Sequence, residues 1–301
     1  MKRLLLSMLR GRTARPTAGS GRDELQPPQQ RDSYFYLGPD SAMTRLLDGH
    51  VLVVDPQDQS VAAHLIVHGY WESWISDVVA RCVGPGDRVV EVGANFGYYT
   101  VAMARRVGPA GRVVAFEANP RVAALLQRTV NFNGYAPRVE VRPQAALDAP
   151  GRIAFAISRD NAGGGHAEVA PGQSAHRESV EVEAVRLDDV VPGEVDFIRI
   201  DAEGSEPLIL RGAERLLASP RVRLCLEWDV HQMSSRASVP DFIAWLQGLG
   251  FGFWRIEHDS TLTPVAADEL ATMPPHDVLV SRSALTVDDS ASPELSASHH
   301  P

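Results

Sequence analysis

The sequence has little of what marks a secreted, metal-bound or membrane-spanning protein. Its 301 residues include only two cysteines, Cys82 and Cys225, and neither has the paired spacing of a zinc site. Both lie among apolar residues, so we expect two buried thiols that pack as small hydrophobic side chains. No apolar run approaches the roughly 18 residues that a membrane-spanning helix needs. Together these absences predict a cytoplasmic protein without integral membrane association.

Positive charge is also scarce. The net charge is −9 and the isoelectric point is near 5.6. A protein whose main partner is a nucleic acid needs a basic surface, so we expect no nucleic acid here. Because 44% of the residues are hydrophobic, the chain can bury a sizeable core. The composition therefore favours a globular protein that acts on small molecules, and it leaves the oligomeric state open.

The two ends of the sequence differ from the part between them. Residues 1–32 are rich in Arg, Pro, Gly and Gln without apolar periodicity, which predicts a flexible arm. The apolar run Leu4–Leu9 is shorter than the roughly 7–15 residues of a signal-peptide core, and no cleavage site follows it. Weak contact with a membrane surface is a minor alternative for this arm. Residues 286–301 predict a disordered tail, which leaves one domain at 33–285.

The domain core, residues 84–282, alternates short apolar segments with helix-like ones. Such alternation predicts a parallel sheet covered by helices on both faces. The expected parallel strands are 88–93, 112–118, 138–143, 195–201 and 222–228. The expected helices are 61–82, 97–107, 120–133, 205–218 and 239–249. An antiparallel pair is expected at 251–257 and 277–282, and an inserted β-hairpin at 152–158 and 179–187.

The segment VVEVGANFGYYT, residues 89–100, ends a buried strand on an acid and then turns at Gly93 and Gly97. The first turn of a helix leaves backbone N–H groups for a ligand, and Glu91 suits an ammonium group directly or through water. A dinucleotide site usually needs G-x-G-x-x-G, and the third glycine is missing in that register. The turn therefore favours a cationic ligand over a diphosphate.

A second acid, Glu117, closes the next strand, where carboxylates commonly bind the two hydroxyls of a ribose. S-adenosylmethionine carries both an amino-acid cation and a ribose, so it matches the two acids together. The alternative is a glycine turn without any cofactor, in which the acids cap the following helices. Asn119 precedes Pro120 and is also explained as a helix N-cap.

The segment FIRIDAEGSEPLILRGAERLL, residues 197–217, repeats this pattern. Asp201 and Glu203 follow a buried strand and can orient a substrate hydroxyl, accept its proton or hold a divalent cation, whereas Glu206 suits a helix dipole. After the next strand, His231 is a candidate general base, with a surface histidine as the alternative. Asp201 and Glu227 together are an alternative Mg²⁺ site.

These motifs, together with VVAFEANP and VNFNGY, resemble the FkbM family of S-adenosylmethionine-dependent methyltransferases from roughly Gly84 to Asp229. The resemblance implies an α/β class I methyltransferase fold: a Rossmann-like three-layer sandwich with a seven-stranded, mostly parallel sheet whose last strand is antiparallel. It implies O-methylation of a hydroxyl on a sugar, a glycolipid or another natural product by in-line SN2 transfer. The competing interpretations are an NAD-dependent oxidoreductase and a non-catalytic methyltransferase-like module.

The resemblance also implies roles for individual residues. The methionine-side loop would consist of Glu91, Gly93, Asn95 and Gly97. Glu117 would bind the ribose with Asn119 nearby, and Asp148 would approach the adenine. Asp201 and Glu203 would lie near the reacting centre, where His231 is a further candidate. Arg199 stands where lysine is common in the family.

Overall fold

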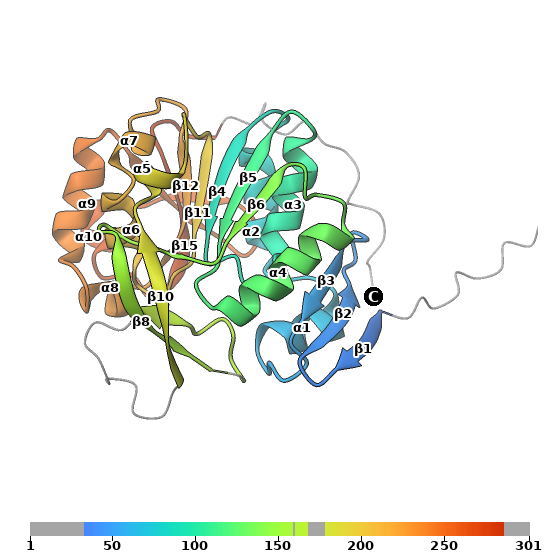
Figure 1. Ribbon diagram of the computed structural model, residues 1–301. Coiled ribbons are helices and arrows are strands. Elements are labelled where there is room, and N and C mark those ends of the chain that lie inside the picture. The colour runs from blue at the N-terminus through green and yellow to red at the C-terminus, as the bar shows by residue number, and fades with distance from the viewer. Residues whose placement is uncertain (1–32, 159, 168–177, 286–301) are drawn as a thin grey trace, which may run out of the picture. The chain divides into compact units, whose positions relative to one another are not determined.

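The computed structural model describes residues 33–158, 160–167 and 178–285 of the chain (Figure 1). The predicted N-terminal arm and C-terminal tail therefore lie outside the described residues. Within the described ranges, none of the helices has the length and hydropathy that crossing a bilayer requires.

A central sheet of eight strands runs through the domain, in the order β14-β13-β15-β12-β11-β4-β5-β6. Its five parallel strands are β4 (Arg88–Val92), β5 (Arg112–Phe116), β6 (Val139–Arg142), β11 (Phe197–Ile200) and β12 (Arg223–Trp228). β15 (His276–Ser281) is antiparallel to β12 and to β13 (Gly252–Ile256). This order is that of a class I methyltransferase, and all seven predicted strands are confirmed. The short β14 (Leu262–Pro264) is an eighth strand that the sequence did not predict.

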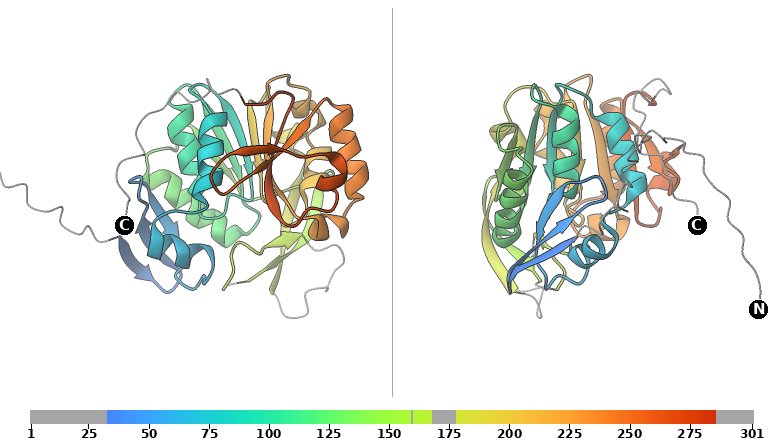
Figure 2. Two further views of the ribbon diagram at one scale, coloured as in Figure 1. Left: turned by 180° about the vertical axis from the view of Figure 1, so that it is seen from behind. Right: turned by 90° about the vertical axis from the view of Figure 1, so that its right-hand side faces the viewer.

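Alternate residues of the parallel strands face two separate helix layers (Figures 1 and 2). Val89 packs with α2 (Ser73–Cys82), α3 (Tyr98–Val107) and α4 (Pro120–Phe132). Val90 packs with α6 (Glu206–Arg211), α7 (Glu214–Leu217) and α9 (Val239–Gly248). Both cysteines are buried free thiols, as expected. The sheet between these layers places its carboxyl edge toward the small N-terminal sheet and the inserted hairpin.

Two helices expected to be continuous are each broken in two. Residues 61–82 form α1 (Val61–His68) and α2, because α1 ends at Gly69. Residues 205–218 form α6 and α7, separated at Gly212. The carbonyl of Gly212 accepts from the N–H of Asp188 at 2.9 Å, and a Cβ at this position would overlap the carbonyl oxygen of Leu147. The close backbone approach at Gly212 therefore interrupts the helix.

The segment before the core forms a three-stranded antiparallel sheet in the order β1-β2-β3. Its strands are β1 (Tyr34–Gly38), β2 (Ser41–Arg45) and β3 (Val51–Val54), and none of them is among the strands expected from the sequence. This sheet packs with α1 and with one side of α4 in a hydrophobic cluster of its own. It thereby brings the start of α1 to the carboxyl edge of the central sheet.

The predicted inserted hairpin is confirmed as β8 (Gly151–Ile157) paired with β10 (Glu178–Val185). The short strands β7 (Ala145–Ala146) and β9 (His166–Ala167) extend it to a four-stranded sheet. Three one-turn helices complete the described elements: α5 (Leu187–Val190), α8 (Val230–Ser234) and α10 (Ala267–Leu270). The glycine-rich loop 160–165 between β8 and β9 lies at the same edge of the central sheet as α1.

Candidate active site

A cavity of about 330 Å³ opens at the carboxyl ends of β4, β5, β11 and β12. Open α/β sheets bind their ligands at this edge. Of the residues that the sequence nominated, Gly93, Asn95, Glu117, Asp201 and Glu203 line the cavity, as does Glu227. The structure thus brings together the ends of the two acidic segments that lie about 100 residues apart in the sequence.

The turn after β4 is held by backbone bonds to the end of β5. The N–H groups of Gly93 and Ala94 both donate to the carbonyl of Phe116 at 3.0 Å. Asn95 has a left-handed φ of 49°, and its N–H donates to Glu117 Oε2 at 2.8 Å. The glycine turn and the acid of the next strand therefore form one structural unit.

Backbone strain is concentrated around this cavity. Four non-glycine residues in the described chain have positive φ, and three of them, Glu72, Asn95 and Glu203, line the cavity. Residues other than glycine rarely adopt this conformation, and they do so mainly at functional sites where the surroundings hold them in place. The clustering is a second reason, besides the position at the carboxyl edge, to take this cavity as the candidate functional site.

Glu117 is buried and accepts two backbone hydrogen bonds, from Asn95 and from Asn119, each at 2.8 Å. Burial raises the pKa of Glu117 to about 7, although these bonds act in the opposite direction. Each carboxylate oxygen has two lone pairs, so both retain capacity for a ligand hydroxyl. Asn119 itself does not line the cavity; its side chain caps α4 by accepting from the N–H of Arg121 at 3.1 Å.

Glu91 lies differently from the expected position beside a ligand ammonium. It is 1% exposed, outside the cavity lining, and it accepts from Thr100 Oγ1 at 2.5 Å. Burial raises its pKa to about 7, and the nearby Arg199 partly opposes the rise. Gly97, at the start of α3, is also outside the lining. Glu91 therefore holds α3 to β4 through Thr100 and does not face the cavity.

We expect Glu91→Gln to flatten the pH dependence of stability. A carboxyl whose pKa rises from 4.5 to about 7 on folding stabilises the fold below pH 4.5, and this stabilisation is lost as pH rises through 7. Removing the group should reduce the fall in unfolding free energy by up to about 1.4 kcal/mol per pH unit in this window. Denaturant titrations at several pH values measure it, with the exposed Glu140→Gln as control. An unchanged slope would contradict the prediction.

Three carboxylates lie on the β11–β12 side of the cavity, opposite Glu117, and they differ in their hydrogen-bond partners. Asp201 Oδ2 accepts from Arg199 Nη2 at 3.0 Å, and Glu203 Oε2 accepts from Gln232 Nε2 at 2.8 Å. Glu227 Oε2 is buried without a hydrogen-bond partner in the described part of the chain. Burial, reinforced by the charges of Asp201 and Glu203, raises the pKa of Glu227 to about 10. The wall therefore combines an oriented carboxylate with a carboxyl that holds its proton at neutral pH.

Arg199 organises this wall from beneath. Its side chain is 3% exposed, and its guanidinium lies 3.9 Å from the centroid of the Tyr99 ring. The hydroxyl of Tyr99 in turn donates to Glu72 Oε2 at 3.1 Å. Sequence reasoning missed Glu72 and Tyr99 as cavity residues and treated Arg199 only as a departure from lysine. A charged residue inside a central, otherwise apolar strand was the signal for Arg199.

Besides Glu91, Gly97 and Asn119, two further nominated residues lie outside the cavity lining. Asp148 is exposed, whereas the four residues before it, 144–147, line the cavity. His231 is exposed on α8, whose N-terminus is capped by Asp229 through the N–H of Gln232 at 3.0 Å. Asp201 and Glu227 share the cavity, but among the described residues no group of three or more His, Cys, Asp or Glu side chains could hold a metal ion.

The roof of the cavity joins two distant segments. Asp58 Oδ1 accepts from the N–H of Ala62, and its Oδ2 accepts from the N–H of Ala162, both at 2.6 Å. Ser60 Oγ donates to Asn161 Oδ1 at 3.0 Å. These bonds fix the glycine-rich loop against the start of α1. The sequence gave no sign of this anchor at Asp58.

Comparison with known proteins identifies one family. A family model described as "Methyltransferase FkbM domain" matches residues 91–253, more than half of the chain. No curated protein sequence matches the chain. The match agrees with the motifs quoted above and extends beyond them to β13.

Several solved structures are similar at low identity. The methyltransferase FkbM from Methylobacillus flagellatus KT is 16% identical over 64% of this chain and 43% of that one, with a TM-score of 0.41. The O-methyltransferase from Bacillus cereus in complex with SAH is 17% identical over 73% and 84%, with a TM-score of 0.42. The SAM-dependent O-methyltransferase from Thermotoga maritima is 14% identical over 84% and 96%, with a TM-score of 0.40. All three scores are below 0.5, whereas the strand order of the chain itself is that of the class I fold.

Proposed function

Because the chain belongs to the FkbM family of methyltransferases, we propose that it uses S-adenosylmethionine to methylate a hydroxyl group of a small molecule, a sugar or another natural product in the cytoplasm. One observation carries the proposal. A single cavity at the carboxyl edge of the sheet has Glu117 at one wall and Asp201 at the other. The family match also argues against the oxidoreductase alternative, which shares the strand, turn and ribose acid.

The residues of the cavity fit this cofactor. Glu117 has free acceptor capacity for a ribose diol. Phe116, Ala146 and Ile209 supply an apolar surface for an adenine ring. When bound, S-adenosylmethionine supplies an electrophilic methyl group on a sulfonium sulfur.

The chain itself positions the acceptor and receives its proton. Asp201 is fixed by Arg199, so its carboxylate is oriented to accept a hydrogen bond from a hydroxyl and then its proton. Glu227, which holds its own proton at neutral pH, is suited to donate a hydrogen bond to a neighbouring acceptor oxygen. The roof over the cavity excludes water from the two groups. Glu203, bonded to Gln232, is assigned to shaping this wall.

Calorimetric titration tests the cofactor proposal. We expect S-adenosylmethionine to bind and NAD not to bind. Glu117→Gln should weaken the binding about tenfold or more, because its amide nitrogen cannot accept a hydrogen bond. Asp148→Asn is the matched control, since Asp148 is exposed outside the lining and should leave the affinity unchanged. Equal losses in the two variants, or binding of NAD alone, would contradict the placement of the pocket.

The acceptor is to be found by transfer of a radiolabelled methyl group to a panel of hydroxylated compounds. Product from a sugar or another small hydroxylated molecule supports the proposal. Transfer only to an amine or to a nucleic acid contradicts it. A parallel reaction with a chelator tests for a metal requirement.

A further inference from the structure

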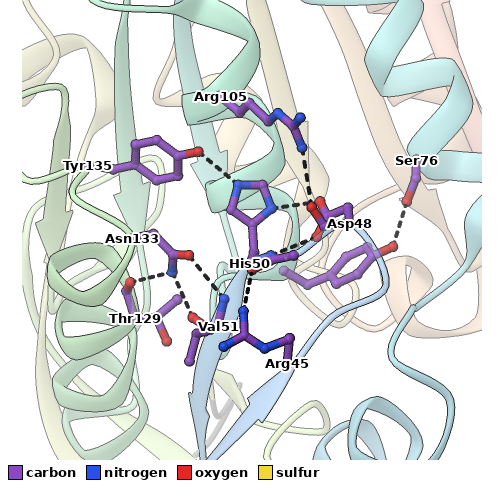
Figure 3. A network of polar contacts seen from close by, with 11 residues as sticks. Arg45, Asp48, His50, Val51, Ser76, Arg105, Thr129, Asn133 and Tyr135 are labelled. Atoms are coloured by element: carbon purple, nitrogen blue, oxygen red, sulfur yellow. Dashed lines mark hydrogen bonds and ion pairs between the residues drawn. The ribbon is translucent and has the colours of Figure 1, made fainter. Parts of the chain in front are cut away.

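The two edge strands of the N-terminal sheet, β3 and β1, differ in whether other residues bond to their outward backbone groups. At β3, side chains of α4 and of the residue after it occupy backbone groups that another strand would use; Figure 3 shows those of Asn133 on Val51. The N–H of Val51 donates to Asn133 Oδ1 at 3.0 Å, and its carbonyl accepts from Asn133 Nδ2 at 2.7 Å. The N–H of Val53 donates to Thr129 Oγ1 at 2.9 Å. The edge at β3 is thereby closed to further strands.

Within the described ranges the edge at β1 is open, since β1 pairs there only with β2. The N–H of Arg45 donates to the carbonyl of Ser33 at 2.8 Å, which makes Ser33–Arg45 a hydrogen-bonded pair. Antiparallel pairs alternate in type, so Phe35 bonds toward β2, whereas the backbone groups of Tyr34 and Tyr36 face the open side. An unpaired row of this kind is a template for a strand of another chain.

The side chains of β1 are apolar and exposed on both faces of the strand. Tyr34, Phe35, Tyr36 and Leu37 are 38%, 45%, 62% and 45% exposed. At about 200 Å² for each aromatic side chain, the row exposes roughly 350–400 Å² per copy, the size at which an apolar patch marks an interaction site. The strand carries no charge, so it lacks the lysines or other charges that usually protect an edge.

We propose that β1 pairs antiparallel with β1 of a second copy of this chain, which joins the two three-stranded sheets into one of six strands. Antiparallel pairing is the arrangement that a two-fold axis produces, so the strand is complementary to itself. The pairing satisfies the outward backbone groups of Tyr34 and Tyr36 and brings the exposed side chains on each face beside those of the second copy. A lipid surface would cover the side chains but leave the backbone groups unpaired.

Charge and area fix the expected strength of this dimer. The chain has a net charge of −9, which opposes self-association, and an uncharged strand is where two copies meet without placing like charges opposite each other. Two copies of the row expose roughly 700–800 Å² of side chain, of which the pairing buries a part, so the buried area is below the about 1,200 Å² of the smallest stable interfaces. We therefore expect a reversible dimer with a dissociation constant in the micromolar range.

Sedimentation velocity on the full chain, over a hundredfold range of concentration, tests the pairing. The wild type should shift from monomer to dimer with increasing concentration. Tyr36→Lys and Tyr36→Glu should each stay monomeric, because each places like charges across the two-fold axis. An equimolar mixture of the two variants should recover dimers, since opposite charges then meet. Recovery in the mixture distinguishes strand pairing from a mere loss of folding.

Leu249→Ser is the control, because Leu249 is an exposed apolar residue beyond α9 and should leave dimerisation unchanged. A dimer that persists in both Tyr36 variants would overturn the proposal and move the interface elsewhere. A wild type that stays monomeric at every concentration would overturn it as well. Binding of that monomer to vesicles of phosphatidylglycerol, lost in Tyr36→Lys, would then assign β1 to a lipid surface. None of these outcomes depends on methyl transfer.

Discussion

Asp201→Asn should lower kcat by about 10²–10⁴-fold while leaving the affinity for S-adenosylmethionine nearly unchanged. The substitution keeps the size and the hydrogen-bonding shape of the side chain but removes its ability to take a proton. Arg199, which donates to Asp201 Oδ2 at 3.0 Å, keeps an oxygen acceptor in the variant. The loss should therefore appear in kcat rather than in cofactor binding. Calorimetry and steady-state kinetics on the same preparation separate the two quantities.

Glu203→Gln is the variant to compare with Asp201→Asn. Glu203 lines the same wall, but one of its oxygens already accepts from Gln232 at 2.8 Å, so we assign it to structure rather than proton transfer. Its replacement should cost less than tenfold in kcat. Thermal unfolding of both variants controls for damage, because weakening the buried pair of Arg199 also reduces stability. If Asp201→Asn turns over at the wild-type rate, Asp201 has no part in the reaction.

Gly93→Ala should destabilise the fold far more than Gly86→Ala. Both glycines have a left-handed backbone, with φ of 80° and 88°, so alanine costs about 1–2 kcal/mol at either position. A Cβ at Gly86 meets nothing within 4 Å, whereas a Cβ at Gly93 would overlap the carbonyl oxygen of Asp201. The overlap should add about 1–3 kcal/mol to the destabilisation at Gly93, because the backbone of Asp201 at the end of β11 has to move. Unfolding in denaturant compares the two variants directly.

The Gly93 variant has a second expected consequence. Moving the backbone of Asp201 displaces the proposed proton acceptor, so kcat should fall even under conditions in which Gly93→Ala is fully folded. The Gly86 variant should keep full activity. Equal destabilisation of the two variants would mean that the close approach of the strands at Gly93 is not present in solution.

The central sheet was predictable from sequence because its strands are nearly continuous runs of Val, Ile and Leu between helices. Features that depend on tertiary contacts were not predictable. The break between α6 and α7 arises from contacts of Gly212 with Asp188 and Leu147, and local helix propensity gives no sign of it. The hairpin of β1 and β2 was missed because β1 has no polar alternation: both of its faces are exposed.

The positions of the site acids were predictable, but the directions of their side chains were not. Glu117 and Asp201 both come directly after the last residue of a strand and line the cavity. Glu91 lies inside β4, where the two-residue period of a strand turns it toward α3 and Thr100. A difference of one or two residues in where a strand ends thus separates a cavity residue from a buried support. Sequence patterns locate strand ends only to within a few residues.

The roof held in place by Asp58 and the walls of the central sheet are expected to contact different molecules, the acceptor and the methyl donor. In the proposed arrangement, walls built by the turns of the central sheet face the methyl donor, which is the same for every member of such an enzyme class. The segment before the core and the inserted hairpin together form the roof of the cavity, under which we expect the acceptor to bind. Substitutions in the roof can therefore change the acceptor without altering the residues that face the methyl donor. We expect differences in substrate choice to arise from changes in residues 58–65 and 151–167.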